Sequence, residues 1–541
     1  MIARIVLIFI LFSLSAVLRA QEEEKKKMPK IELEHYVDFY DQEHEKKYSE
    51  GDMLYGKKHG VWTYYYRNGQ KQEQSEYTNG NLSGSVLYWF DNGQRQSLGY
   101  FKLLFQNGVL SSVRDSIYKE WYPNGNMATK GEYSYDVKNG AWTYWYPEGD
   151  KWKEIEYENG MARPINGWDK NLKKTLADGN GILYDYGEMG PLKSRLSIQD
   201  STFNGLAEYV YENGKPEMEG VLKNNVKDGV WHYYYREGGQ QKDVSYSNGI
   251  LDGPYKNWYP NGEISVEGNH EKGLKNGHWK WFNSTGEKYM EGDFLDEMQH
   301  GNWVYYFENG QIEATGNFEK DLRQGEWKMF YKDGSKWKVG SYKDDKKDGH
   351  WVVYFESGQI LQEGDYKSGK EEGEWTAWYQ NGQVKDVGSY KAGIMDGKWS
   401  GWYDNGKLNY SGVRKQGEKT GHWTFGYPNG KTREEGDYTD GLKDGKWTYY
   451  YESGMIDFES DYEKGAKNGK STYYYEHGSK LRQETYKMDR LEGKSIMWGP
   501  KENILSERNF KNGLPHGKVI DYDDQGKKIN EAVYKEGVKI K

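Results

Sequence analysis

Along most of this chain, apolar and polar side chains alternate in short runs that end at glycine. Within residues 373–379, Trp375 and Tyr379 fall on one side of the alternation and Trp378 falls on the other. An Asn-Gly pair follows, and residues 383–390 alternate again before the next glycine. A period of two that is bounded by turn residues predicts two β-strands joined in a hairpin.

The same pattern returns every 24 residues. We align the units on the glycine two residues before the first tryptophan, the anchor glycine, and count it as position 1. The nineteen units begin at Gly60, Gly84, Ser116, Gly140, Gly181, Gly205, Gly229, Gly253, Gly277, Gly301, Gly325, Gly349, Gly373, Gly397, Gly421, Gly445, Gly469, Gly493 and Gly517. A lone hairpin is marginally stable, so each unit must pair with its neighbours. The sequence therefore predicts an all-β fold, an elongated single-layer array of antiparallel hairpins.

Side-chain alternation assigns aromatic rings to both faces of this array. The third and seventh positions share one face, where we expect the rings to hold hairpin to hairpin. The third-position residues are Trp231, Trp279, Trp303, Trp327, Trp351, Trp375, Trp399, Trp423 and Trp447.

The opposite face carries a second row of rings at the sixth position. Its members are Trp258, Phe282, Tyr306, Phe330, Tyr354, Trp378 and Trp402. A single-layer sheet cannot bury both of its faces. These rings are therefore candidate partner-binding residues, with packing between hairpins as the alternative.

Several segments fall outside the repeat. Residues 21–50 read as a charged leader followed by a cap for the first strand edge. Repeats fill residues 51–160 with a short insertion near 103–112, and they run uninterrupted over 178–541. Residues 161–177 are expected to form an insertion loop, which either carries a specific function or is merely tolerated.

Residues 1–20 have the layout of a secretory signal peptide. Arg4 precedes a short apolar stretch, and Ala20 is a small residue before the expected cleavage at Gln21. This predicts export to the periplasm or cell surface, with an uncleaved N-terminal anchor as the alternative. The chain has no cysteine, which excludes disulfides and thiolate chemistry.

Composition supports a thin β-structure over disorder. The chain is rich in Trp, Tyr and Gly, whereas disordered chains are poor in aromatic residues. Its net charge is −9, and basic and acidic side chains are evenly mixed. Because no basic block is present, nucleic acid is not expected as a partner.

The residue patterns of known catalytic and metal sites are missing from the sequence. His278, His350 and His422 share the second position, but they stand three units apart, too far to share one metal ion. The acidic run Asp521 to Gly526 resembles a calcium loop, yet Ala532 stands where its final glutamate is required. We therefore expect a non-enzymatic protein with no cofactor and no metal.

The units resemble MORN repeats, and more closely the bacterial MORN-repeat variant. Here that motif reads Gly349-His-Trp351-Val-Val-Tyr354-Phe355-Glu-Ser-Gly358, followed by Gly364-Asp-Tyr366-Lys-Ser-Gly369, and the resemblance covers residues 51–541. It implies the antitoxin component of a bacterial toxin–antitoxin module, or a scaffold that binds proteins or membranes. More faintly, the units resemble Gly-Trp modules that bind choline or glucan on cell walls.

Three functional hypotheses follow. The first is an exported scaffold that binds a protein partner along the sixth-position rings. The second is a cell-wall, glycan or membrane-surface binding module that uses the same rings. The third is an antitoxin or immunity component. The sequence does not identify the partner.

Overall fold

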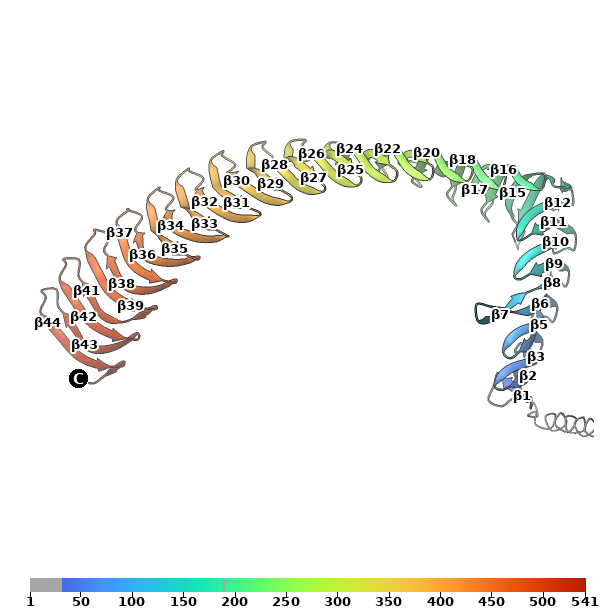
Figure 1. The fold of residues 1–541 in the computed structure, drawn as a ribbon, viewed down its shortest axis with the longest axis horizontal. Helices are drawn as coiled ribbons and strands as arrows, with labels where there is room; N and C mark the ends of the chain where they lie inside the picture. Colours follow the sequence, from blue (N-terminus) through green and yellow to red (C-terminus); the bar gives the residue numbers. More distant parts are fainter. Residues whose placement is uncertain (1–31, 188–189) are drawn as a thin grey trace, which may run out of the picture. The chain divides into compact units, whose positions relative to one another are not determined.

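The structure is a computed structural model that describes residues 32–187 and 190–541. The described residues form 45 β-strands and no helix, so the predicted all-β hairpin array is confirmed (Figure 1). The expected signal peptide at 1–20 and the beginning of the charged leader lie outside the described residues. In the part of the chain that is described, no helix could cross a membrane.

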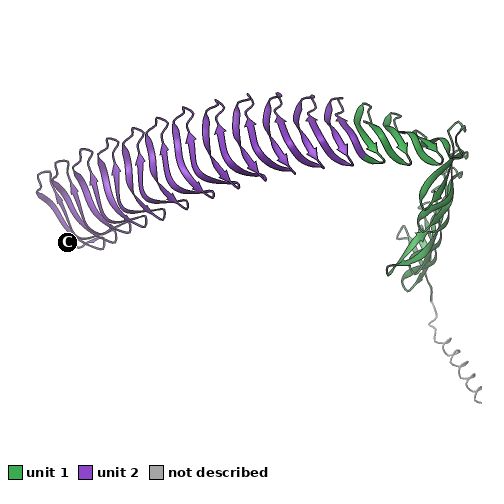
Figure 2. Ribbon diagram, turned by 45° about the horizontal axis from the view of Figure 1, so that its top comes forward, with its two compact units in different colours: residues 1–250 green, residues 251–541 purple. Residues whose placement is uncertain are grey.

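The chain divides into two compact units, residues 1–250 and residues 251–541 (Figure 2). In the first unit consecutive strands pair antiparallel, except that β8 pairs with β6 across the side hairpin β7. Its strands are β1 (Glu34–Phe39), β2 (Lys47–Leu54), β3 (Lys57–Tyr65), β4 (Lys71–Thr78), β5 (Asn81–Trp89), β6 (Arg95–Gln106), β7 (Val109–Arg114), β8 (Ser116–Trp121), β9 (Met127–Ser134), β10 (Val137–Trp145), β11 (Lys151–Glu158), β12 (Met161–Trp168), β13 (Lys174–Ala177), β14 (Asn180–Tyr186), β15 (Leu192–Gln199), β16 (Thr202–Val210), β17 (Pro216–Lys223), β18 (Val226–Tyr234) and β19 (Gln240–Ser247).

The second unit continues the same antiparallel pairing from strand to strand, with β41 pairing to β39 beside the two-residue β40. Its strands are β20 (Ile250–Trp258), β21 (Ile264–Glu271), β22 (Leu274–Phe282), β23 (Lys288–Leu295), β24 (Met298–Tyr306), β25 (Ile312–Glu319), β26 (Leu322–Phe330), β27 (Lys336–Lys343), β28 (Lys346–Tyr354), β29 (Ile360–Lys367), β30 (Lys370–Trp378), β31 (Val384–Lys391), β32 (Ile394–Trp402), β33 (Leu408–Lys415), β34 (Glu418–Gly426), β35 (Thr432–Thr439), β36 (Leu442–Tyr450), β37 (Ile456–Glu463), β38 (Ala466–Tyr474), β39 (Lys480–Lys487), β40 (Arg490–Leu491), β41 (Gly493–Trp498), β42 (Ile504–Lys511), β43 (Leu514–Tyr522), β44 (Lys528–Lys535) and β45 (Val538–Lys539).

The hairpin of β28 and β29 shows how the repeat closes. The amide of Phe355 donates to the carbonyl of Gln359 at 2.8 Å, and the amide of Gly358 donates to the carbonyl of Phe355 at 2.9 Å. Gly358 has φ +87°, a left-handed conformation that glycine adopts without steric strain. The tenth-position glycine thus ends the turn and starts the second strand.

The links between hairpins lie earlier than the sequence suggested. Asp-Gly and Asn-Gly pairs that include the anchor glycine, such as Asp228-Gly229, predict such links from the sequence, but both of these residues lie inside β18. Gly229 sits instead at a step in register, where the pairing of β17 with β18 shifts between Glu219 and Val221. The preceding link is Asn224-Asn225, where both residues have positive φ, as a type I′ turn requires.

The segments outside the regular repeat are also strands. Residues 103–112 lengthen β6 and form β7, a side hairpin on the sheet. The expected loop at 161–177 is a shortened hairpin instead, because β12 pairs with β11 and with β13. At the N-terminus β1 pairs with β2, so the described part of the leader covers the edge of the first repeat.

Candidate functional site

The third-position tryptophans form the core of the array. All nine are buried except Trp375, which is half-buried. Each ring lies over the sixteenth position of the preceding hairpin, which is glycine in most units. A Cβ atom built on Gly340 would stand only 2.1 Å from Cδ2 of Trp351. The indole N–H of Trp351 also donates to the carbonyl of Ser341 at 3.0 Å. The other eight tryptophans make the equivalent hydrogen bond.

Phe or Tyr at the eighteenth position turns this row into a herringbone. Adjacent rings meet nearly edge to face, with centroids 5.0–6.2 Å apart and interplanar angles of 76–88°. The continuous series is Trp279, Phe294, Trp303, Phe318, Trp327, Tyr342, Trp351, Tyr366, Trp375, Tyr390 and Trp399. Each such contact contributes about 0.5–1.5 kcal/mol beyond area burial. We call this side of the sheet the tryptophan face.

Lysine side chains cover many of these rings. The Nζ atom of Lys443 lies 3.9 Å from the ring centroid of Trp447, 4.8 Å from Tyr449 and 5.7 Å from Tyr462. Lys419 lies 4.8–4.9 Å from the three equivalent rings. Burial lowers the pKa of Lys419, and the charge of Arg414 adds to that effect. The chain's own ammonium groups thus use the ring faces that an external cation would need.

The sixth-position rings lie on the opposite face, which we call the open face. All seven candidates are half-buried. The hydroxyl of Tyr306 donates to Oε1 of Glu291 at 2.5 Å, on the strand of the preceding hairpin. Glu291 itself stands opposite Val304, so both side chains belong to the face that tryptophan does not occupy. Their role in binding stays a prediction.

Seventh-position tyrosines lock each turn to the next hairpin. The hydroxyl of Tyr331 donates to the backbone carbonyl of Tyr354 at 2.8 Å, and Tyr379 makes the same bond to Trp402 at 2.9 Å. These bonds fix the backbone at the sixth position and so fix where the candidate rings stand. Phe307 occupies this position without a hydroxyl.

Histidines of the open face lie between two carboxylates. In His278, Nδ1 stands 2.8 Å from Asp293 and Nε2 stands 3.2 Å from Glu291. His350 and His422 repeat this arrangement. Burial pushes the pKa of Glu291 upward, but hydrogen bonds from Lys288, Tyr306 and His278 outweigh it and lower the pKa to about 2. Among the described residues, no group of three His, Cys, Asp or Glu side chains could hold a metal ion.

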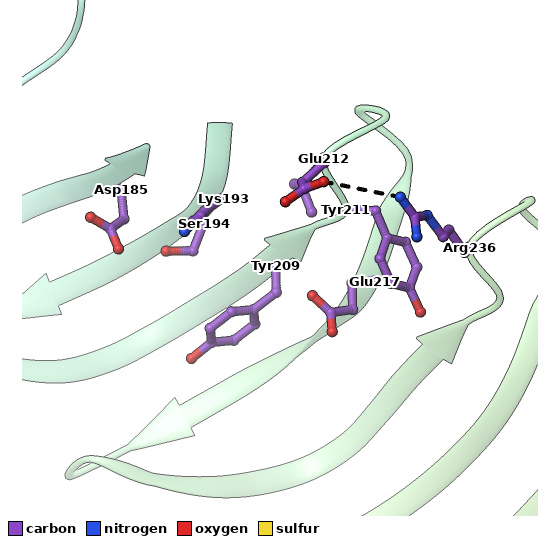
Figure 3. Close-up of a pocket in the computed structure, with 9 residues that line it drawn as sticks. Asp185, Lys193, Ser194, Tyr209, Tyr211, Glu212, Glu217 and Arg236 are labelled. Carbon is purple, nitrogen blue, oxygen red and sulfur yellow. Dashed lines mark ion pairs between the residues drawn. The ribbon is translucent and has the colours of Figure 1, made fainter. Parts of the chain in front are cut away.

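Shallow cavities follow the turn edge of the sheet. In the first unit a cavity of about 450 Å³ is lined by Asp185, Lys193, Tyr209, Glu217 and Arg236, among others (Figure 3). Arg236 lies 4.0 Å from Glu212 at its rim. A second cavity, of about 470 Å³, lies in the second unit and is lined mainly by apolar groups, including Phe307, Met329 and Trp337. These linings can take up a side chain or a small ring of a ligand.

Sequence reasoning missed part of this arrangement. The alternation places the fifth position on the tryptophan face, but it did not single out the rings there, such as Trp281, which lies 5.7 Å from Trp303. The residue type at the fifth position varies from Trp281 to Met329, Ala377 and Gly401, so no single letter marks it. The lysines that lie over the rings recur two residues before the anchor glycine in many units. This regularity in the sequence could have revealed them.

Eleven segments of the chain match the MORN repeat variant family. They are residues 58–79, 114–135, 138–159, 251–272, 299–320, 323–344, 347–368, 371–392, 395–416, 443–464 and 467–488. Each match spans one hairpin, as 347–368 spans β28 and β29. No curated protein matches the chain.

Among solved structures the chain is similar to a complex described as TcdB2-TccC3-Cdc42, with 8% identity, a TM-score of 0.13, and coverage of 93% of this chain and 30% of that one. A Photorhabdus luminescens Tc holotoxin pore gives 7% identity, a TM-score of 0.13, and coverage of 91% and 28%. The chain thus spans about a third of the length of these structures or less, and TM-scores this low bear on neither fold nor function.

The matched segments share the observed hairpin, and most of them carry its third-position tryptophan. This chain is a tandem MORN-repeat protein.

Proposed function

We propose that the protein is an exported, non-enzymatic scaffold that binds a protein partner along the sixth-position rings of the open face. The observation that supports this most is the difference between the two faces. On the tryptophan face, rings contact one another and indole N–H groups bond to carbonyls. On the open face, half-buried rings stand beside charged side chains: Tyr306 bonds to Glu291, and Lys288 lies 4.7 Å from its ring centroid.

The spacing of those rings suits an extended interface. Successive candidates are two strands apart, which is about 9.6 Å at the usual ~4.8 Å between strands. Aromatic anchors surrounded by polar groups are typical of protein interfaces. Along the open face, lysine–glutamate pairs such as Lys288 with Glu291 would supply the polar surroundings.

Catalysis is not part of the proposal. A general base needs a nitrogen or oxygen free to accept a proton from a substrate. Both ring nitrogens of His278 face carboxylates, and the copies at His350 and His422 do the same. Such side chains are better suited to bracing neighbouring strands.

Site-specific photo-crosslinking tests the proposal in cells that make the protein. A photoreactive phenylalanine analogue replaces Trp378 or Trp402 on the open face, and in a control it replaces Ile394, which is exposed at a link between hairpins. We expect one discrete crosslinked protein from the two open-face positions, and its absence from position 394. With the photoreactive residue at position 378, the additional substitutions Trp258→Ala and Trp402→Ala should abolish that product, which is the second expected result. Equal crosslinking from all three positions would contradict the face assignment.

The alternatives give different results. A cell-wall or glycan-binding module would be retained on a choline or glucan column, with no crosslinked protein. The lysines over the rings of the tryptophan face argue against choline there. An antitoxin role predicts that co-expression rescues cells from a toxin encoded beside this chain.

A further inference from the structure

One repeat reverses the charge of the lysine arrangement on the tryptophan face. Two residues before the anchor glycine, a lysine or arginine lies over aromatic rings in many units, as Lys347, Lys419, Lys443 and Lys467 do. In the unit that begins at Gly373 this position is Glu371. It is the one acidic residue at that position in the described repeats.

The rings themselves are kept in this unit. Trp375 and Tyr390 lie 6.2 Å apart with an interplanar angle of 78°, and Tyr366 of the preceding hairpin meets Trp375 at 5.0 Å. Glu371 stands directly opposite Tyr366 in the sheet register. Burial raises the pKa of Tyr390, and the charge of Glu371 raises it further. The carboxylate of Glu371 therefore lies near the ring of Tyr390 as well.

Trp375 is also less buried than its counterparts. Of the nine third-position tryptophans, it alone is not buried. The fifth position of its unit is Ala377, where the unit of Lys443 has Tyr449. A small side chain and a carboxylate therefore border a ring face that a neighbouring tyrosine and a lysine cover elsewhere.

The nearest basic side chains are used by other rings. The Nζ atom of Lys347 lies 4.5 Å from both Trp351 and Tyr366. Arg414 donates to the carbonyl of Gly417 at 2.6 Å and lies over Trp423. Glu371 is near Lys347, where its charge offsets part of the burial effect that lowers the pKa of that ammonium. Burial first, and then the charge of Glu371 and a hydrogen bond to it, raise the pKa of Tyr366 to about 12. Within the described residues, however, no ion pair to Glu371 closer than 4.0 Å is present, and no lysine or arginine lies over Trp375 or Tyr390.

We propose that Glu371, Trp375 and Tyr390 form a site for an external primary alkylammonium group, of the kind that a lysine side chain carries. The repeat shows the recognition mode: an ammonium over an indole and a phenol ring, at 3.9 Å and 5.7 Å in the unit of Lys443. At Glu371 the fold keeps two rings, exchanges the tethered cation for a carboxylate, and leaves the ring accessible. Aromatic faces and a carboxylate together favour a cation.

This site lies on the tryptophan face, so it is independent of the proposed partner surface. Its probe is n-butylammonium, observed by saturation-transfer NMR with the full chain. Glu371→Lys restores the tethered lysine of the other units and should weaken butylammonium binding at least tenfold. Glu371→Gln, which removes the charge and keeps the shape, should weaken it severalfold. Tetramethylammonium should bind more weakly than butylammonium.

Glu374→Lys is the matched control, because it makes the same charge change three residues away at the second position, on the open face. We expect Glu374→Lys to bind butylammonium as tightly as the parent protein does. The open-face variant Trp258→Ala, Trp378→Ala, Trp402→Ala should also bind it as tightly as the parent. Equal binding by Glu371→Lys and the parent protein, or no binding by the parent, would overturn the site. Tighter binding of tetramethylammonium would overturn its assignment to a lysine-type group.

Discussion

Gly340 and Trp351 stand directly opposite each other on β27 and β28, and the indole ring fills the space that a side chain at residue 340 would need. The same pairing joins Gly316 to Trp327 and Gly364 to Trp375. Where serine replaces the tryptophan, the partner changes as well: Ser460 and Ser471 are both buried, and their hydroxyls lie 2.6 Å apart. The glycine and the tryptophan are therefore one structural element shared by two hairpins.

Gly340→Ala should destabilise the second unit. Its Cβ would lie 2.1 Å from Trp351, so the ring or the strand must move. Overpacking of this kind costs about 1–3 kcal/mol, and we expect the upper part of that range because the indole is also hydrogen-bonded. Chemical denaturation followed by tryptophan fluorescence measures the loss. Ser341→Ala, which adds no atom toward the ring, should change stability by less than about 0.5 kcal/mol.

The pairing should also be visible as coupling between the two positions. Gly340→Ser and Trp351→Ser each remove the fit, but together they recreate the serine pair of residues 460 and 471. We expect the double variant to be more stable than the sum of the single losses predicts, by at least about 1 kcal/mol. Strict additivity in this double-mutant cycle would show that the two residues act independently.

The seventh-position hydroxyl should stabilise the array by a modest amount. Tyr331→Phe removes its bond to the carbonyl of Tyr354 and should cost about 0.5–1.5 kcal/mol. Phe307→Tyr should do the reverse, because it offers the missing hydroxyl to the next hairpin. Thermal unfolding of both variants measures the two shifts, and shifts in the same direction would refute this account of the turn.

Acid should weaken the open face at Glu291. Its pKa is lowered to about 2 in the folded chain, against an ordinary value near 4.5. Because the folded pKa is lower than the unfolded one, the stabilisation is complete above about pH 4.5 and is lost as the pH falls through about 2. Glu291→Gln should therefore be less stable than the parent at pH 7, and the difference should disappear near pH 2. Urea unfolding at pH 7, 4 and 2.5 tests this; a difference that persists unchanged at pH 2.5 contradicts it.

The period of the sequence predicted the hairpins because Trp351 and Gly358 recur with it at fixed spacing. It did not single out the fifth-position rings of the tryptophan face, since Trp281 and Ala377 occupy that position without a common residue type. The short hairpin of β12 and β13 was also missed. Its strands lack the Gly-x-Trp signature, and the pairing comes from neighbouring strands that offer an open edge.

A deletion series tests the central claim, that two dozen residues make one hairpin which is stable only beside its copies. Deleting residues 349–372 removes one whole unit and keeps the register of all the others. Deleting residues 349–360 removes half a unit, including most of β28, and leaves strand β29 paired with β30 alone. Near-ultraviolet circular dichroism and denaturant unfolding report on the aromatic packing. We expect native-like packing with cooperative unfolding after the 24-residue deletion, and loss of both after the 12-residue deletion. The same behaviour in both variants would contradict the repeat account.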